Sequence, residues 1–277
     1  MDNEQEFDLY IESGKTEKQY FKDIWRYREL FFFLSWRDIL VRYKQTVIGI
    51  LWAVLRPLLT MLVFTFVFGN IAKMPSDGGA PYPILVYSAM LPWQFFASAL
   101  QESGNSLISN ANMISKIYFP RLVIPTSSVI VSFIDFLISF LILIVLMVVY
   151  GFAPSFRILT LLLFTIIAFF ASMGCGLWLA ALNVKYRDFR YIIPFVVQFG
   201  LYISPVGYSS SMIPEQWRLL YSMNPMVGVI DGFRWAIIGN TQIYMPGFIL
   251  SLVIVTVVFL TGLFYFRRTE KVFADII

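Results

Sequence analysis

The sequence predicts an all-α fold, a polytopic membrane protein with six transmembrane helices. Of its 277 residues, 58% are hydrophobic and only 14% are charged, whereas about a quarter of the residues in a soluble domain are charged. A helix needs about 20 residues to cross the hydrocarbon core, and six apolar segments approach or exceed that length. We place these spans at about residues 47–72, 83–104, 122–150, 157–182, 191–208 and 246–266. Together they form a transmembrane domain over residues 47–268, and a short tail, residues 269–277, follows it.

Two segments precede the transmembrane domain. Residues 1–24 are polar, mixed in charge and without an apolar core after a basic start, so no cleavable signal peptide is expected. Residues 25–46 contain neither proline nor glycine, and their basic and aromatic side chains separate onto different helix faces, which predicts an amphipathic interface helix. The simplest role of that helix is to anchor the chain. The alternative is a gate at an entrance, where Arg37, Arg42 and Lys44 would meet an anionic ligand.

Lysines and arginines are distributed unevenly between the two sides of the predicted spans. Sixteen of the 21 lie in the N-terminal region, in two of the connections between spans and in the tail; four lie on the other side, and Arg56 falls within a span. Because lysine and arginine concentrate on the cytoplasmic side, we expect both termini in the cytoplasm of a multi-pass inner (plasma) membrane protein.

Three ionisable residues, Arg56, Glu102 and Asp135, fall within predicted spans. Burying a charge in lipid is costly, so each should face a partner, the bundle interior or water. The simplest interpretation is an ion pair of Arg56 with Asp135 or Glu102. The alternative is contact between Arg56 and a transported solute.

The fifth predicted span carries four aromatic residues on one helix face. Their spacing places them within about 80° of one another, and they are Tyr191, Phe195, Phe199 and Tyr202. Packing is the common role of such a stripe. The alternative is a wall along which sugar rings slide, because the apolar faces of sugars stack on aromatic rings.

The connection between the fifth and sixth spans contains two helix starts and a stop. Pro214 and Pro225 stand where helices begin, and Gly239 suits a helix end. The two short helices predicted here are too short and too charged to span. We expect a re-entrant hairpin that dips toward the outer leaflet and serves as a lid over an exit.

The connection between the second and third spans contains the stretch NANMISKIYFPR. Leu107, Ala111, Ile114 and Tyr118, spaced at 0, 4, 7 and 11, would share one helix face, and Pro120 would end the helix. An exposed apolar face on a short cytoplasmic helix implies a protein partner.

Several chemical functions are excluded by composition. There is no histidine and one cysteine, which excludes zinc sites built on histidine, Ser-His-Asp triads and an internal disulfide. No G-x-x-x-x-G-K-[ST] motif occurs, so we expect no nucleotide hydrolysis by a P-loop in this chain. If the chain performs work, the energy must come from an ion gradient or from a separate ATPase subunit. Gradient-driven carriers usually show internal repeats, and we find none.

Five stretches occur in an order that is specific as a set. They are RYKQTVIGILWAVLRPLLTMLVFTFVFG, MLPWQFFASAL, NANMISKIYFPR, LNVKYRDFRYIIP and NPMVGVIDGFR. With these motifs, the chain resembles the transmembrane subunits of ABC-type polysaccharide exporters, which export O-antigen, capsule or teichoic-acid chains. The resemblance covers about residues 26–268.

The resemblance implies a homodimer of this subunit with two copies of a cytoplasmic P-loop ATPase, which would bind ATP and Mg²⁺. The polysaccharide would be carried on a polyprenyl diphosphate lipid and pass through a channel at the dimer interface. This chain would not be an enzyme by itself and would hold no cofactor or metal. Membrane lipid would surround it, and no nucleic-acid partner is expected.

The resemblance also implies roles for four groups of residues. The first cytoplasmic loop, about Asn105–Phe119, would form a coupling helix in a cleft of the ATPase, and the second loop would make a lesser contact. The coupling residues would be Leu107, Ala111, Ile114, Lys116, Tyr118, Lys185, Arg187 and Asp188. The residues lining the channel would be Trp52, Arg56, Tyr191, Phe195, Phe199 and Tyr202. The entrance residues facing the lipid diphosphate would be Arg37, Arg42 and Lys44, and those of the outer gate Trp217, Tyr221, Phe233 and Trp235.

Two alternatives compete with this interpretation. One is a related ABC permease for a lipid, a drug or another small amphipathic solute. The other is a membrane-embedded transferase, which is disfavoured because the chain has no histidine and no D-x-D-like metal pair.

Overall fold

The computed structural model describes residues 24–44 and 49–273, and these residues form helices, turns and loops without any strand. The all-α prediction is therefore confirmed for the described part of the chain. The polar segment predicted over residues 1–24 lies almost entirely outside the described residues. So do residues 47 and 48, at the expected start of the first span, and residues 274–277 of the tail.

Five of the described helices are long and apolar enough to cross a membrane. The first combines α3 (Gly49–Phe64) with a π-helical segment (Thr65–Ile71); the others are α4 (Tyr82–Ser109), α6 (Val123–Val149), α7 (Leu161–Lys185, after a 3-10 segment, Phe156–Thr160) and α11 (Met245–Thr269, continued by Glu270–Val272). In lipid every backbone N–H and C=O must find a partner within the protein, and a helix satisfies them within the segment. The chain is accordingly a multi-pass membrane protein.

The segment predicted as the fifth span contains a shorter helix, α8 (Phe189–Ile203), of only 15 residues. It ends because Ser204 has an extended backbone, with φ −80° and ψ 151°, the conformation that a following proline favours. Pro205 therefore ends this helix before the expected boundary at residue 208. A span of full length over residues 191–208 is not confirmed.

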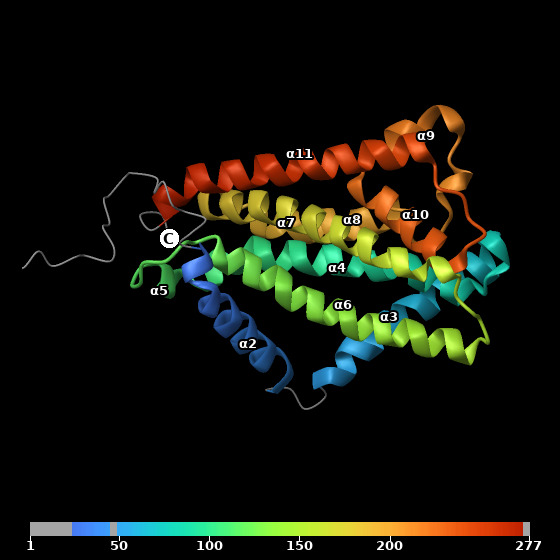
Figure 1. The fold of residues 1–277 in the computed structure, drawn as a ribbon, viewed down its shortest axis with the longest axis horizontal. Coiled ribbons are helices and arrows are strands. Elements are labelled where there is room, and N and C mark those ends of the chain that lie inside the picture. Colours follow the sequence, from blue (N-terminus) through green and yellow to red (C-terminus); the bar gives the residue numbers. More distant parts are fainter. Residues whose placement is uncertain (1–23, 45–48, 274–277) are drawn as a thin grey trace, which may run out of the picture.

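Helix α4 lies at the centre of the bundle and packs against α6, α7, α8 and α10, the last of which spans Pro225–Ile238 (Figure 1). Most of its residues are buried, whereas α3 and α11 expose much of their apolar surface. Helices α7 and α11 approach closely at Gly174 and Gly262, where an added Cβ on Gly262 would lie 2.5 Å from the carbonyl oxygen of Gly174. Small residues permit such close helix packing in membranes.

Shorter helices cover the two ends of the bundle (Figure 1). At one end lie α5 (Ala111–Ile114) and the start of α2 (Arg28–Lys44), which packs against α6; at the other lie α9 (Glu215–Tyr221) and α10 (Pro225–Ile238), which packs among α4, α7 and α11. The side chain of Asn224 accepts a hydrogen bond from the backbone N–H of Met226, 3.0 Å away, and so caps α10. Gly239 ends α10 with φ +82°, a conformation that glycine adopts without strain.

Candidate functional site

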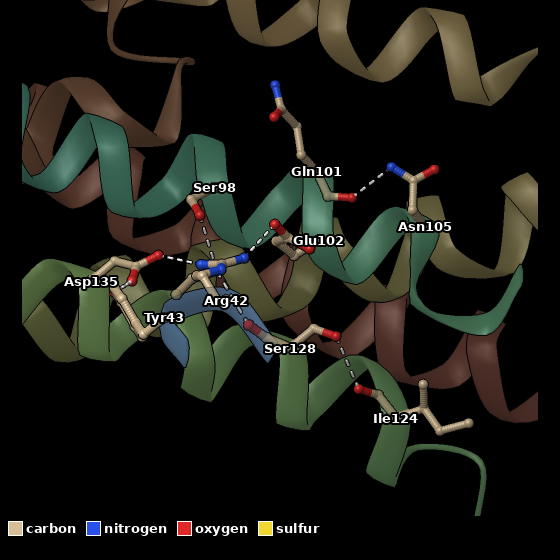
Figure 2. A network of polar contacts seen from close by, with 10 residues as sticks. Arg42, Tyr43, Ser98, Gln101, Glu102, Asn105, Ile124, Ser128 and Asp135 are labelled. Atoms are coloured by element: carbon tan, nitrogen blue, oxygen red, sulfur yellow. Dashed lines mark hydrogen bonds and ion pairs between the residues drawn. The ribbon is translucent and has the colours of Figure 1, made fainter. Parts of the chain in front are cut away.

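A polar network joins α2 to two long helices, α4 and α6 (Figure 2). Arg42, near the end of α2, donates hydrogen bonds to the carboxylates of Glu102 on α4 and Asp135 on α6. The hydroxyl of Tyr43 donates to the second oxygen of Asp135. Carboxylates within spans need partners of this kind. The guanidinium of Arg42 and the phenol of Tyr43, both on α2, supply them.

The protonation state of Tyr43 suits this role. Burial of the phenol, followed by its hydrogen bond to Asp135, raises the pKa of Tyr43 above its ordinary value. The hydroxyl therefore stays a donor at neutral pH. In the described ranges, no three acidic or cysteine side chains gather as they would to hold a metal ion; Glu102 and Asp135 serve the guanidinium of Arg42 instead.

The expected ion pair of Arg56 with Asp135 or Glu102 is wrong. Arg42 occupies both carboxylates, and Arg56 is exposed on α3 without an ion pair to any described residue. The reason is tertiary, since α2 packs against α6 and brings a guanidinium to these acids from outside the span. Arg42 lies on the polar face of its helix, which is the one sequence signal that could have identified it.

The three basic residues expected at an entrance differ in their surroundings. Arg42 is held by two carboxylates, so it is not a free cation for an anionic ligand. Arg37 pairs with Asp38 at 2.7 Å and donates to the side-chain oxygen of Asn110 at 3.0 Å. Lys44 is exposed at the end of α2, with no ion pair to the described residues. Of the three, Lys44 alone keeps an exposed and uncompensated charge.

The predicted coupling helix is interrupted. Helix α4 continues to Ser109, Asn110 leaves the helical conformation with ψ +21°, and α5 is a single turn. The expected exposed apolar face is therefore wrong, because Leu107 and Ile114 are buried within the protomer. Tyr118 of the predicted face is 48% exposed, as expected, and the neighbouring Ile117 is 61% exposed; both follow α5.

The second loop lies beside the first. Asn183, near the end of α7, donates from its side-chain amide to the carbonyl oxygen of Gly104, 2.8 Å away, and to the side-chain oxygen of Asn105, 3.1 Å away. The residues of this second loop that were assigned to coupling are all exposed, namely Lys185, Arg187 and Asp188. Lys116 of the first loop is exposed as well. Exposed charged side chains of both loops thus lie at the same end of the bundle as the exposed Ile117 and Tyr118.

The aromatic stripe of α8 faces outward. Its four members are between 52% and 78% exposed: Tyr191, Phe195, Phe199 and Tyr202. The opposite face of α8 is packed, with Ile193 buried and Gly200 against the ring of Trp93. Apart from Tyr202, whose ring stacks on Phe64 of α3, the stripe is not packed inside the protomer.

Helices α3 and α8 meet at one stacked pair of aromatic rings. The ring of Tyr202 stacks on that of Phe64 of α3, with centroids 6.5 Å apart, and the rings of Phe195 and Phe199 are 4.3 Å apart. Trp52 and Arg56 are one helical turn apart on α3, and both are exposed. We call the α8 stripe together with these exposed α3 residues the α3/α8 face.

The residues assigned to an outer gate do not form one group. Phe233 is buried in the core, edge to face with Phe136 at 6.2 Å, so its assignment to a gate surface is wrong. Trp217 is exposed on α9. Tyr221 shares a hydrogen bond with Tyr208 at 3.0 Å, and its burial, then this bond, raises the pKa of Tyr221. Trp235 is half-buried.

Sequence reasoning missed the role of Arg234 of α10, a buried cation at this end of the bundle. Its guanidinium donates to the carbonyl oxygens of Val206 at 3.0 Å and Tyr208 at 2.7 Å. These carbonyls belong to the loop that follows α8, where helical hydrogen bonds end, and buried carbonyls need partners. A single arginine within an apolar run, GFRWAII, is the signal that could have indicated it.

Known proteins resemble this chain over most of its length. The family described as ABC-2 type transporter matches residues 29–238. An O-antigen export system permease protein RfbA from Klebsiella pneumoniae is 30% identical over 249 residues, which are 87% of this chain and 92% of that protein. Its namesake from Myxococcus xanthus is 27% identical over 90% of this chain and 96% of that protein. The polysialic acid transport protein KpsM from Escherichia coli is 25% identical over 77% of this chain and 80% of that protein.

Proposed function

Because this chain belongs to the ABC-2 type transporter family, as its motifs indicated, we propose that it is the permease subunit of an ATP-driven exporter of polysaccharide across the inner (plasma) membrane. The printed names of its relatives, O-antigen export permease and polysialic acid transport protein, support this class of cargo. The proposed assembly is a homodimer with two copies of a P-loop ATPase. The proposed cargo is a polysaccharide linked to a polyprenyl diphosphate.

The α3/α8 face is the observation that carries this proposal. Two copies joined around this face would enclose a passage lined by aromatic rings. Such rings present large apolar surfaces, on which the apolar faces of sugars can stack. The stripe itself carries no charge, so that each contact with a passing sugar stays weak. In this arrangement α8 is the fifth of six spans, Trp52 and Arg56 contact the cargo, and Trp217 and Trp235 stand near the exit.

In this proposal, the end of the bundle that carries α2 and α5 faces the ATPase. We propose that Ile117 and Tyr118 enter a cleft of that subunit, flanked by Lys116 and by the second loop. Leu107 and Ile114 anchor the segment to the protomer, and the bond between Arg37 and Asn110 links it to α2. Movement of the segment would thereby reach α2 and, through Arg42, the two long helices α4 and α6.

This orientation places both termini in the cytoplasm, in agreement with the excess of lysine and arginine there. It also places Lys44 at the cytoplasmic entrance. We propose that Lys44, and not Arg42, meets the diphosphate of the lipid carrier, because two carboxylates already compensate Arg42.

Reconstitution tests the function directly. The permease and its ATPase are placed in liposomes, and ATP hydrolysis is measured with a polyprenyl-diphosphate glycan, with the same lipid without sugar, and with an amphipathic drug. We expect stimulation by the glycan-bearing lipid and transport of its sugar chain. Stimulation by the drug alone would instead favour the related permease for small amphipathic solutes. Transfer of sugar or acyl groups without the ATPase would favour a membrane transferase.

A further inference from the structure

A cavity of about 680 Å³ lies at the end of the bundle opposite α2, away from the α3/α8 face. It is bounded by the 3-10 segment that precedes α7, by the end of α10 and by the segment that leads into α11. Its volume lies within the range of about 300–1,000 Å³ that small-molecule sites occupy. Apart from Trp235, the residues that line this cavity have no role in the functions proposed above.

The charge of the cavity is positive. Among the described residues that line it, Arg157 is the only one with a charged side chain. The guanidinium of Arg157 lies over the ring of Trp235, 4.8 Å from the centroid, and donates one hydrogen bond to the carbonyl oxygen of Gly239 at 2.7 Å. These contacts hold the guanidinium in place while most of its five N–H donors stay available.

Neutral polar groups complete one side of the cavity. Asn240 and Gln242 are exposed there, and neither amide has a hydrogen-bond partner among the described residues. The hydroxyl of Thr241 is buried without a partner in the described chain. Arginine with adjacent amides and a hydroxyl is suited to oxygen atoms that accept several hydrogen bonds at once, as those of a phosphate do.

The other side of the cavity is apolar and continues onto the outside of the bundle. Phe164 and Phe248 line its wall, and the exposed side chains of Leu163 and Met245 stand at its edge. Beyond them, the outer faces of α7 and α11 expose further apolar residues, among them Leu162. The cavity thus joins a cationic, hydrogen-bonding region to an apolar surface of the kind that contacts acyl chains.

We propose that this cavity binds the phosphate headgroup of an anionic membrane phospholipid, with its acyl chains along α7 and α11. The phosphate accepts from Arg157 and the amides, and the chains cover the apolar faces. In the orientation proposed above, the lipid belongs to the outer leaflet. The inference needs only a membrane-embedded chain and does not depend on which cargo is exported.

Native mass spectrometry of the full-length protein, purified in detergent with its ATPase, tests the proposal. The probes are phosphatidylglycerol, a diacylglycerol with the same chains but no phosphate, and glycerol phosphate without chains. We expect phosphatidylglycerol to bind with an affinity at least about tenfold higher than either fragment, because a phosphate bound to arginine and the burial of acyl chains each contribute about tenfold or more.

Variants locate the site. Arg157→Gln should weaken phosphatidylglycerol binding about tenfold, and Leu163→Trp, which fills the cavity without touching the guanidinium, should weaken it as well. Lys73→Gln removes another exposed cation that does not line the cavity and should leave binding unchanged.

Three results would overturn the proposal. Unchanged binding in both Arg157→Gln and Leu163→Trp would exclude this cavity. Equal binding of diacylglycerol would show that no phosphate is recognised. Equal binding of glycerol phosphate would show a site for a soluble anion, such as an acidic sugar, and not for a lipid.

Discussion

Replacing Arg42 with glutamine should destabilise the protein by about 2 kcal/mol. The size of this loss follows from how exposed the paired side chains are. An exposed ion pair contributes about 0–1 kcal/mol, whereas breaking a buried pair costs about 3–5 kcal/mol. The side chains of Arg42 and Asp135 are 28% and 26% exposed, and that of Glu102 is 49% exposed. The Arg42–Asp135 pair lies between the two limits, and the Arg42–Glu102 pair lies near the exposed one.

Double-mutant cycles separate the two pairs. We expect a coupling free energy of about 1–2 kcal/mol between Arg42→Gln and Asp135→Asn, and of less than about 1 kcal/mol between Arg42→Gln and Glu102→Gln. The free energy of unfolding is measured by titration with SDS in mixed micelles, with loss of helical circular dichroism as the signal.

The order of the two couplings decides the outcome. A larger coupling for Glu102 than for Asp135 would refute the reasoning from exposure. Couplings below about 0.5 kcal/mol for both, the usual error of additivity, would mean that the network does not stabilise the attachment of α2.

Other perturbations test further parts of the structure. Ile117→Asp should weaken association with the ATPase about tenfold in co-purification, and the exposed Leu219→Asp on α9, at the other end, should not; equal effects would contradict the docking surface. Gly262→Leu should cost about 2–3 kcal/mol, because its Cβ would meet the backbone of α7, and an unchanged unfolding midpoint would argue against the close contact. Arg56→Gln should change stability by less than about 0.5 kcal/mol and lower export, so that normal export would remove Arg56 from the channel. A raised folded-state pKa means that Tyr43 contributes stability that is complete below the ordinary tyrosine pKa of about 10 and declines as pH rises above it; Tyr43→Phe should reduce this decline, and an identical alkaline profile would contradict the buried phenol.

The candidate site could be predicted from the sequence only in part. Periodicity placed the four aromatic residues of α8 on one face, and the structure exposes all four. The same reasoning gave Leu107 and Ile114 a partner outside the protomer, but the chain breaks at Asn110 and buries them. Periodicity states which residues share a helix face, and it does not state what covers that face.

The sequence by itself determined an all-α, multi-pass membrane protein whose motifs resemble those of ABC-type polysaccharide exporter permeases. Long apolar runs permit no other structure in lipid than helices that satisfy their own backbone groups. Only the tertiary structure decided which arginine meets Glu102 and Asp135, which arginine holds the loop after α8, and which aromatic residues stay outside the core. Those contacts join residues that are 60 and 93 positions apart for Arg42 and 26 and 28 positions apart for Arg234. Such distances along the chain are closed by helix packing, which local pattern does not encode.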